Sequence, residues 1–272
     1  MVDPKKKAWL DEMTWEEAKD AFKKTDVAVI CLGSTHGHGV AAPLGTDTFV
    51  ADGIGQRVGM RSNVVVLRTI PYGWNEYHMD FPGTINVSRQ HLYDLYSDIC
   101  DSLYKWGIRK IVWLSPHGGN TSVIEDLSYK LRYEKGVLSA KVGYGHAGQV
   151  KPELSGFGSE GMVDEAAMML YLKPETAHPE RPKWKDYKNP FGPNLKCLAL
   201  RTWQFGPGTV EIYNTSKDIT DECGWGNTPK AADMKNATKE LGEGIIETAT
   251  NYIVEFIEEF RKINMPSTYA PL

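Results

Sequence analysis

A repeated alternation of short apolar runs with longer helical stretches constrains the fold of this chain more than any other feature of its sequence. The apolar runs occupy residues 26–33, 63–69, 109–115 and 139–145, and stretches with helical spacing lie between them. Short apolar runs bounded by turn residues are typical of buried strands. Because neighbouring parallel strands are joined by crossover helices, the alternation predicts βαβ units. The sequence therefore predicts an α/β fold with a mostly parallel sheet that helices cover on both faces.

The remaining segments add further helices and one long irregular region. Thr14 and Glu17 form a capping-box pattern at the start of a helix, and residues 161–172 have the composition of a buried helix. Residues 173–229 are rich in proline, glycine and aromatic residues, which indicates loops and edge strands that line a pocket or an oligomer contact. A long C-terminal helix is expected over residues 231–262.

Composition and charge exclude several classes of partner. The formal net charge is −4 and no basic face is evident, so nucleic acid is not expected as a partner. No apolar run approaches the roughly 20 residues that span a bilayer, and the N-terminal segment lacks the apolar core of a secretory signal. The four cysteines form no CxxC pair. We therefore expect reduced thiols in a cytoplasmic protein that acts on a small-molecule substrate.

Titratable side chains follow each of the four expected strands. In parallel α/β sheets, ligands bind at the carboxyl ends of the strands, which meet at one edge of the sheet. The side chains at these ends are His36, His38, His78, His117, His146 and Glu160. We therefore expect them to point toward one common rim.

The segment GSTHGHGVAAPLGTD, residues 33–47, holds the strongest candidates for a metal site. His36 and His38 are two residues apart, so in an extended segment both imidazoles face the same side. Asp47 falls where the next helix should start, and a carboxylate there can bridge two cations. Together with His117 they form an imidazole and carboxylate set that suits zinc, manganese or iron and leaves positions for water. Each feature alone is also typical of a turn, a helix cap or a surface histidine, but their occurrence at successive strand ends favours a metal site.

Four segments of the chain resemble the creatininase (creatinine amidohydrolase) superfamily in sequence, order and spacing. They are LGSTHGHGVAAPLGTDT, YGWNEYHMDFPGT, LSPHGGN and DEAAMMLYLKPE, which together cover roughly residues 26–175. The resemblance implies a three-layer α/β/α sandwich in a single domain over residues 1–272. It also implies a centre of two divalent metal ions and assembly into a homohexamer.

The resemblance further implies a ligand set. Asp47 corresponds to the aspartate that bridges both metals, His117 to a ligand of the first metal and His38 to a ligand of the second. Glu165 corresponds to the glutamate of the family's Glu-Thr-Ser segment and is the candidate for a further carboxylate ligand. His36 stands where the family usually has a glutamate ligand, so the chain is expected to be an atypical member.

The histidine that the family uses for proton transfer has two candidate counterparts. Counting back from Glu165 places Glu160 at that position, so that histidine and glutamate are exchanged between two positions facing one site. An alignment with a gap places His146 there instead. Glu160 and His146 are therefore both candidates for the catalytic proton transfer.

Two further segments supply candidates for contact with the substrate. The YGWNEYH loop offers aromatic side chains to line a pocket and polar side chains for hydrogen bonding, and the HGGN turn offers its glycines. The substrate-binding candidates are Tyr72, Trp74, Asn75, His78, Gly118 and Gly119.

This set of residues predicts a hydrolase in which a water molecule activated by two metals attacks a carbonyl group. The first hypothesis is an amidohydrolase that opens or deacylates a small cyclic amide, as in most of the superfamily. The exchange of His36 and Glu160 argues against creatinine itself. One alternative is hydrolysis of a carbon–carbon bond in a cyclic polyol diketone, as in the 3-dehydro-scyllo-inosose hydrolases of inositol catabolism. A second alternative is a non-catalytic subunit that binds a small molecule.

Overall fold

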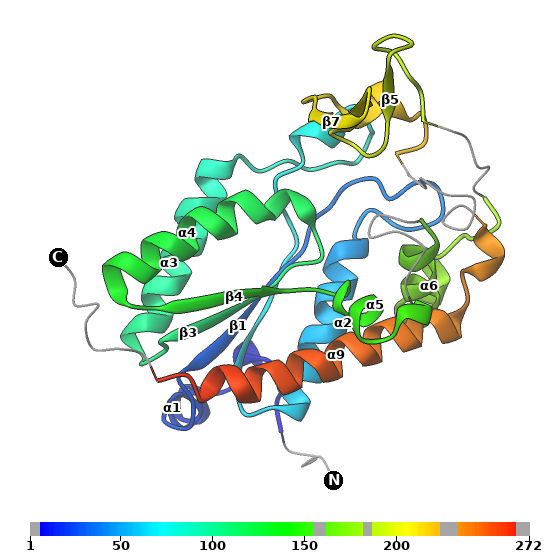
Figure 1. Ribbon diagram of the computed structural model, residues 1–272. Helices are drawn as coiled ribbons and strands as arrows, with labels where there is room; N and C mark the ends of the chain where they lie inside the picture. The colour runs from blue at the N-terminus through cyan, green and yellow to red at the C-terminus, as the bar shows by residue number, and fades with distance from the viewer. Residues whose placement is uncertain (1–5, 155–161, 182–186, 224–232, 265–272) are drawn as a thin grey trace.

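The computed structural model describes residues 6–154, 162–181, 187–223 and 233–264 (Figure 1). Its centre is a four-stranded parallel sheet in the order β2-β1-β3-β4. The strands are β1 (Val27–Leu32), β2 (Val65–Ile70), β3 (Lys110–Leu114) and β4 (Leu138–Val142). The four predicted strand positions and the parallel sheet are confirmed.

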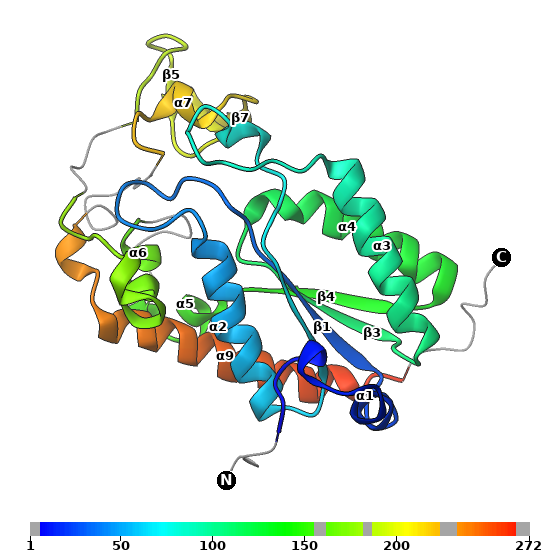
Figure 2. The same ribbon diagram turned by 180° about the vertical axis from the view of Figure 1, so that it is seen from behind.

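Helices cover both faces of this sheet, so the fold has three layers (Figures 1 and 2). One face is covered by α2 (Thr46–Arg61) and α9 (Lys239–Arg261), and the other by α3 (Arg89–Lys105) and α4 (Thr121–Lys135). Alternate residues of β1 enter opposite cores: Val29 packs on the α2 and α9 side, and Ile30 on the α3 and α4 side. All of β1 is buried, which explains why its sequence is continuously apolar.

Shorter helices complete the layers. They are α1 (Trp15–Phe22), α5 (His146–Val150), α6 (Met162–Leu172) and α7 (Ser216–Ile219), with 3₁₀ helices at Leu10–Glu12, Glu76–His78, Gly118–Asn120, Pro152–Leu154, Pro174–Thr176 and Met234–Asn236. The capping box of α1 forms as predicted, because Thr14 Oγ1 accepts from the Glu17 amide and the Glu17 carboxylate accepts from the Thr14 amide.

The C-terminal helix is shorter than the sequence pattern predicts. It begins at Lys239 rather than at residue 231, and residues 231–232 lie outside the described residues. Thr238 is the N-cap residue of this helix. Its side-chain oxygen accepts a hydrogen bond from the Leu241 amide, which fixes the start of the helix at Lys239. None of the described helices is both long enough and apolar enough to cross a membrane.

A small antiparallel sheet lies beyond the carboxyl end of the central sheet, at the top of Figure 1. It consists of β5 (Leu195–Cys197), β6 (Thr202–Phe205) and β7 (Gly208–Glu211). Trp203 is its fully buried anchor and packs with Cys197 and Ile219. The irregular region predicted from composition thus contains edge-type strands, and its position brings it over the strand ends where ligands bind in this class of fold.

Candidate metal centre

The loops after β1 and β3 bring four predicted metal ligands together at the carboxyl end of the sheet. His36 and His38 follow β1, and His117 follows β3. Asp47 lies in the first turn of α2, where the amide groups of the helix favour a carboxylate. Each of the four residues is at most 5% exposed. The sequence spacing therefore does place these side chains in one buried group.

One carboxylate oxygen lies at the centre of this group. Asp47 Oδ2 is 3.2 Å from His117 Nδ1 and 3.7 Å from both His36 Nδ1 and His38 Nε2. The ring of His36 lies between the other two imidazoles, with centroid separations of 4.1 Å to His38 and 4.6 Å to His117. Ligand atoms of His36, Asp47 and His117 all lie within 4.8 Å of one another, as a shared cation requires.

Two atoms at the centre of the group are buried without a hydrogen-bond partner in the described part of the chain. They are His38 Nε2 and Asp47 Oδ2. Leaving such groups unsatisfied costs about 1–3 kcal/mol each, so native proteins rarely do so without a reason. Two ligands about 2.1 Å from one zinc ion at tetrahedral angles lie about 3.4 Å apart. The distances from Asp47 Oδ2 to His117 Nδ1 and His38 Nε2 are close to this value. The residues therefore fit a divalent cation.

A backbone carbonyl sets which nitrogen of His117 can bind a cation. His117 Nε2 lies 3.0 Å from the carbonyl oxygen of Trp74, and because a carbonyl only accepts, Nε2 must donate. Neutral His117 therefore presents the lone pair of Nδ1 toward Asp47. The contact needs a glycine at position 119, since a Cβ there would lie 2.3 Å from both His117 Nε2 and the Trp74 oxygen.

A chain of buried hydrogen bonds orients His36. The Asn75 side chain donates to the carbonyl oxygen of Ile85, so its Oδ1 accepts from the Ser34 hydroxyl, at 2.8 Å. The Ser34 oxygen then accepts from His36 Nδ1, at 3.0 Å. This arrangement fixes the ring of His36 and leaves Nε2 unprotonated, as a metal ligand must be.

Burial and neighbouring charges shift the pKa values of the group in different directions. Burial lowers the pKa of His36 far below its usual value, and the imidazoles of His38 and His117 add to this effect. Burial also lowers the pKa of His38, but the carboxylates of Glu165 and Asp47 outweigh it and raise that pKa to about 9. Burial raises the pKa of Asp47, whereas His38 and His117 lower it more strongly. A proton on His38 would therefore compete with a cation for this site.

Glu165 reaches the group from α6. Its Oε1 lies 3.2 Å from His38 Nδ1, on the side of the ring away from Asp47. A carboxylate in this position holds the Nδ1 proton and directs Nε2 toward a cation. The structure thus brings Glu165 to the predicted centre, as a hydrogen-bonding partner of His38.

The group forms one side of a cavity of about 340 Å³. His78, Gly118 and Glu165 are predicted site residues that line it together with the four central side chains. The sequence did not single out the other residues that line it, which are Gly37, Tyr77, Pro116, Lys141, Tyr144, Leu200 and Cys223. Leu200 and Cys223 come from the region after residue 173 that was expected to line a pocket.

Several other predicted residues lie away from the cavity. Tyr72 is 46% exposed, and Trp74 packs behind Tyr77 with ring centroids 5.0 Å apart. Asn75 and Gly119 are buried and support His36 and His117 rather than line the cavity. In α5, the ring of His146 packs against Tyr252 and its Nδ1 contacts Gln149. Glu160 lies outside the described residues.

His78 lines the cavity beside His36. Its ring stacks on the His36 ring, with centroids 4.3 Å apart, and its Nδ1 lies 2.7 Å from the Ser216 hydroxyl. Burial, together with His117 and His38, lowers the pKa of His78 to about 3. His78 is therefore neutral at physiological pH.

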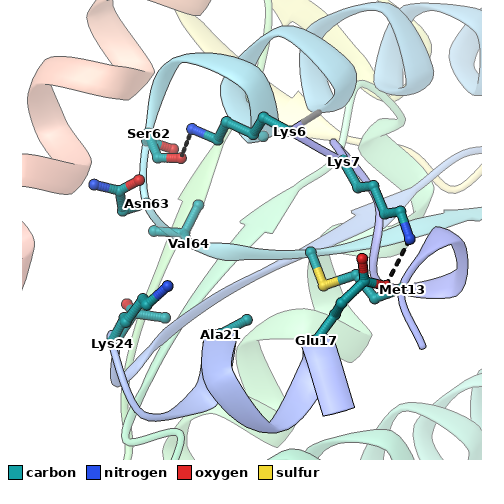
Figure 3. Close-up of a pocket in the computed structure, with 11 residues that line it drawn as sticks. Lys6, Lys7, Met13, Glu17, Ala21, Lys24, Ser62, Asn63 and Val64 are labelled. Carbon is teal, nitrogen blue, oxygen red and sulfur yellow. Dashed lines mark hydrogen bonds and ion pairs between the residues drawn. The ribbon is translucent and has the colours of Figure 1, made fainter. Parts of the chain in front are cut away.

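A second hollow lies at the opposite end of the sheet, between the N-terminal segment, α1 and the end of α2 (Figure 3). Lys6 Nζ donates to the carbonyl oxygens of Met60 and Ser62, where a cation stabilises a helix C-terminus. Lys7 forms an ion pair with Glu17. Because Lys6 and Lys7 already have partners within the protein, we interpret this hollow as a packing contact between the N-terminal segment, α1 and α2, and not as a ligand site.

The family of the chain follows from its sequence as well as from this geometry. The model of the creatininase family, described as creatinine amidohydrolase, matches residues 11–257. The chain belongs to the creatininase family. The match spans the metal centre and most of α9, so the resemblance inferred from four segments extends over nearly the whole chain.

Characterised relatives in the family have different activities. A 3-dehydro-scyllo-inosose hydrolase of Thermotoga maritima is 31% identical over 111 residues, which are 40% of this chain and 36% of that protein. A mycofactocin precursor peptide peptidase of Mycobacterium ulcerans is 28% identical over 162 residues, 56% of this chain and 61% of that protein. A creatinine amidohydrolase of Pseudomonas putida is 25% identical over 134 residues, 47% and 52% of the two chains. The matches thus span less than two thirds of each relative.

Solved creatininase structures share the fold over almost the full length. A creatinine amidohydrolase superposes with a TM-score of 0.74 at 22% identity, covering 95% of this chain and 100% of that chain. A putative creatinine amidohydrolase from Bacteroides fragilis gives a TM-score of 0.68 at 22% identity, covering 96% and 99%. Two further creatininase structures are described as Mn and Zn-Zn forms. The creatininase-like architecture is therefore confirmed.

Proposed function

We propose that this protein is a metal-dependent hydrolase that attacks a small amide-type substrate with a cation-bound water. The observation that carries this proposal is the pair of unsatisfied buried atoms, His38 Nε2 and Asp47 Oδ2, at the centre of an imidazole group. A divalent cation bound there would lower the pKa of a water ligand, polarise the substrate carbonyl and stabilise the oxyanion that forms.

The buried residues of the group would have separate roles in binding the cations. Asp47 would share its carboxylate between two cations, with His36 and His117 on one side and His38 on the other. Glu165 would keep the His38 proton on Nδ1 and so hold Nε2 ready as a ligand. The burial of all four central residues limits competition from bulk water.

The proton transfer to the leaving group is assigned to Glu160. His146 is not among the described residues that line the cavity, and its ring packs against Tyr252, which supports this choice over the alternative alignment. His78 lines the cavity as a neutral imidazole and would donate or accept a hydrogen bond with the substrate. A Glu160→Gln variant should lose turnover but retain its cations, which separates proton transfer from metal binding.

The bond that is cleaved is proposed to be an amide, as the names of the creatinine amidohydrolase and peptidase relatives suggest. The specific alternative is hydrolysis of a carbon–carbon bond in a cyclic polyol diketone. It is supported by the 31% identity to the inosose hydrolase of Thermotoga maritima. In that reaction the leaving group is a carbon atom, which also requires a proton donor such as Glu160.

The decisive experiment combines metal analysis with a substrate panel. Protein purified without chelator is analysed for zinc, manganese and iron, and then assayed with cyclic amides, short peptides and cyclic polyol diketones. Bound cations with turnover of an amide support the first proposal, and turnover of a diketone alone supports the alternative. Protein that retains no stoichiometric transition metal and turns over nothing would instead be a non-catalytic binding subunit.

The proposal extends to assembly and location. A homohexamer in the cytoplasm is proposed from the family resemblance, and the buried, unpaired state of the four cysteines suits a reducing compartment. Light scattering coupled to size exclusion measures the assembly directly.

A further inference from the structure

The cavity of the metal centre contains a cationic side chain that the proposed reaction does not use. Lys141 lines this cavity together with His117 and Tyr144. It lies in β4, one residue before the strand ends at Val142. Since β4 is parallel to β3 and Lys141 is opposite Trp113, its position in the sheet is at the same carboxyl end as the metal ligands.

A hydrogen bond holds the ammonium group of Lys141 close to the turn that carries His117. Lys141 Nζ lies 2.8 Å from Oγ1 of Thr121, which is the first residue of α4 and follows the Gly118–Asn120 turn directly. An ammonium group has three donors, and this contact uses one of them. Among the described residues, the remaining donors are available to a ligand in the cavity.

The charges of the cavity favour an anionic ligand. Its carboxylates in the described part of the chain are Asp47 and Glu165, and both are directed at imidazoles of the metal centre. Two divalent cations and Lys141 would therefore leave an excess of positive charge. Lys141 is an exposed residue, and partial burial lowers the pKa of its ammonium group while Glu125 on α4 opposes this shift.

We infer that Lys141 binds a carboxylate group of the substrate while the metal centre binds the carbonyl group under attack. The inference rests on the proposed function and narrows its substrate class to acids. Two sources of the carboxylate fit this chemistry: a small-molecule acid, or a peptide with a free C-terminus. The cavity of about 340 Å³ has room for a small acid or the end of a peptide.

Ligand binding to the Co²⁺-loaded protein tests this without knowledge of the substrate. The visible absorption of Co²⁺ reports ligands that enter its coordination sphere, and acetate is compared with malonate, succinate and glutarate. If Lys141 captures a second carboxylate, at least one of the diacids should bind about tenfold more tightly than acetate. Lys141→Met should remove this advantage and leave acetate binding unchanged, whereas Lys141→Arg should retain it.

The matched control is Lys130→Met, which removes an exposed lysine of α4 that does not line the cavity. It should retain the preference for the diacid. Equal binding of acetate and all diacids by the natural protein, or an unchanged preference in Lys141→Met, would overturn the inference while leaving the metal centre intact. Absence of any Co²⁺ absorption bands would overturn the proposed function and this inference together.

A second arm distinguishes the source of the carboxylate. Glycylglycine presents a peptide C-terminus, and its C-terminal amide lacks the carboxylate. A preference for glycylglycine over the amide that disappears in Lys141→Met indicates a peptide substrate. A Lys141-dependent preference confined to the simple diacids indicates a small-molecule acid, and both results support the carboxylate site.

Discussion

The Nε2 atom of His38 lies 3.7 Å from Oδ2 of Asp47, and neither atom has a hydrogen-bond partner among the described residues. Around them, Trp74 sets the tautomer of His117 and Glu165 holds the far nitrogen of His38. His117 Nε2 and His38 Nδ1, which face away from the centre of the group, thus have partners, whereas His38 Nε2 and Asp47 Oδ2 at the centre have none among the described residues. That distribution is expected of a site that a cation completes.

Asp47→Asn should abolish the metal centre. The amide keeps the size of the carboxylate but removes its charge, so cation affinity and turnover should each fall more than about 100-fold. Metal content after dialysis and the initial rate on the substrate found by screening measure the two effects. Asp126→Asn, on the exposed side of α4, is the control and should retain both. Full metal content in Asp47→Asn would refute the bridging role.

Glu165→Gln should weaken metal binding less than loss of Asp47. The glutamine oxygen can still accept the His38 Nδ1 proton at the 3.2 Å contact, but the negative charge that supports it is gone. Affinity for zinc should therefore fall about 10-fold, and Glu165→Ala should weaken it further by freeing the ring of His38. Competition with a chromogenic chelator gives the constants. A loss as large as in Asp47→Asn would show instead that Glu165 binds the cation directly.

The stability of the metal-free protein should decrease from pH 6.5 to pH 9. The pKa of His38 in the fold is about 9, above its ordinary value of 6.5, because Glu165 and Asp47 outweigh the effect of burial. A raised pKa means that the charged imidazole stabilises the fold fully below pH 6.5, and that this contribution disappears as the pH rises through 9. Melting curves of the chelator-treated protein across this range measure the effect.

His38→Gln should remove that part of the pH dependence, while His91→Gln on the exposed face of α3 should leave it unchanged. A cation and a proton compete for His38, so the affinity of the protein for zinc should rise over the same pH range. Opposite trends for metal-free stability and metal affinity are thus expected. Parallel trends would mean that His38 is not the residue that exchanges a proton for a cation.

The sequence was sufficient to predict the central sheet and the grouping of four side chains at its carboxyl end. The apolar run of β1 is continuous because helices cover both of its faces, and the strand ends of a parallel sheet must meet at one edge. The spacing of His36, His38 and Asp47 then determines that they converge. These predictions depend on local periodicity and on a topology with few alternatives.

The residues that sequence reasoning missed depend on side-chain direction within irregular segments. Tyr77 lines the cavity and Trp74 packs behind it, although both are aromatic residues of the same loop. Tyr77 lies in the 3₁₀ turn at Glu76–His78 and Trp74 lies before it, a difference that the composition of the loop does not reveal. Lys141 is an exposed residue of an edge strand, and nothing in the sequence distinguishes it from other surface lysines. Only the pairing of β4 with β3 and the contact with Thr121 show that it also lines the cavity.

Gly119→Ala should disrupt the metal centre, whereas Gly118→Ala should not. A Cβ at position 119 would lie 2.3 Å from both His117 Nε2 and the Trp74 carbonyl oxygen, so the hydrogen bond that orients His117 must break or the turn must move. At position 118 the added methyl group meets no atom within 4 Å. Gly119→Ala should therefore lose bound metal and about 1–3 kcal/mol of unfolding free energy.

Gly118→Ala is the control and should retain its metal and its melting temperature. Its methyl group can still alter substrate binding, since residue 118 lines the cavity. Equal metal content in the two variants would show that the contact between His117 and Trp74 does not control the ligand nitrogen.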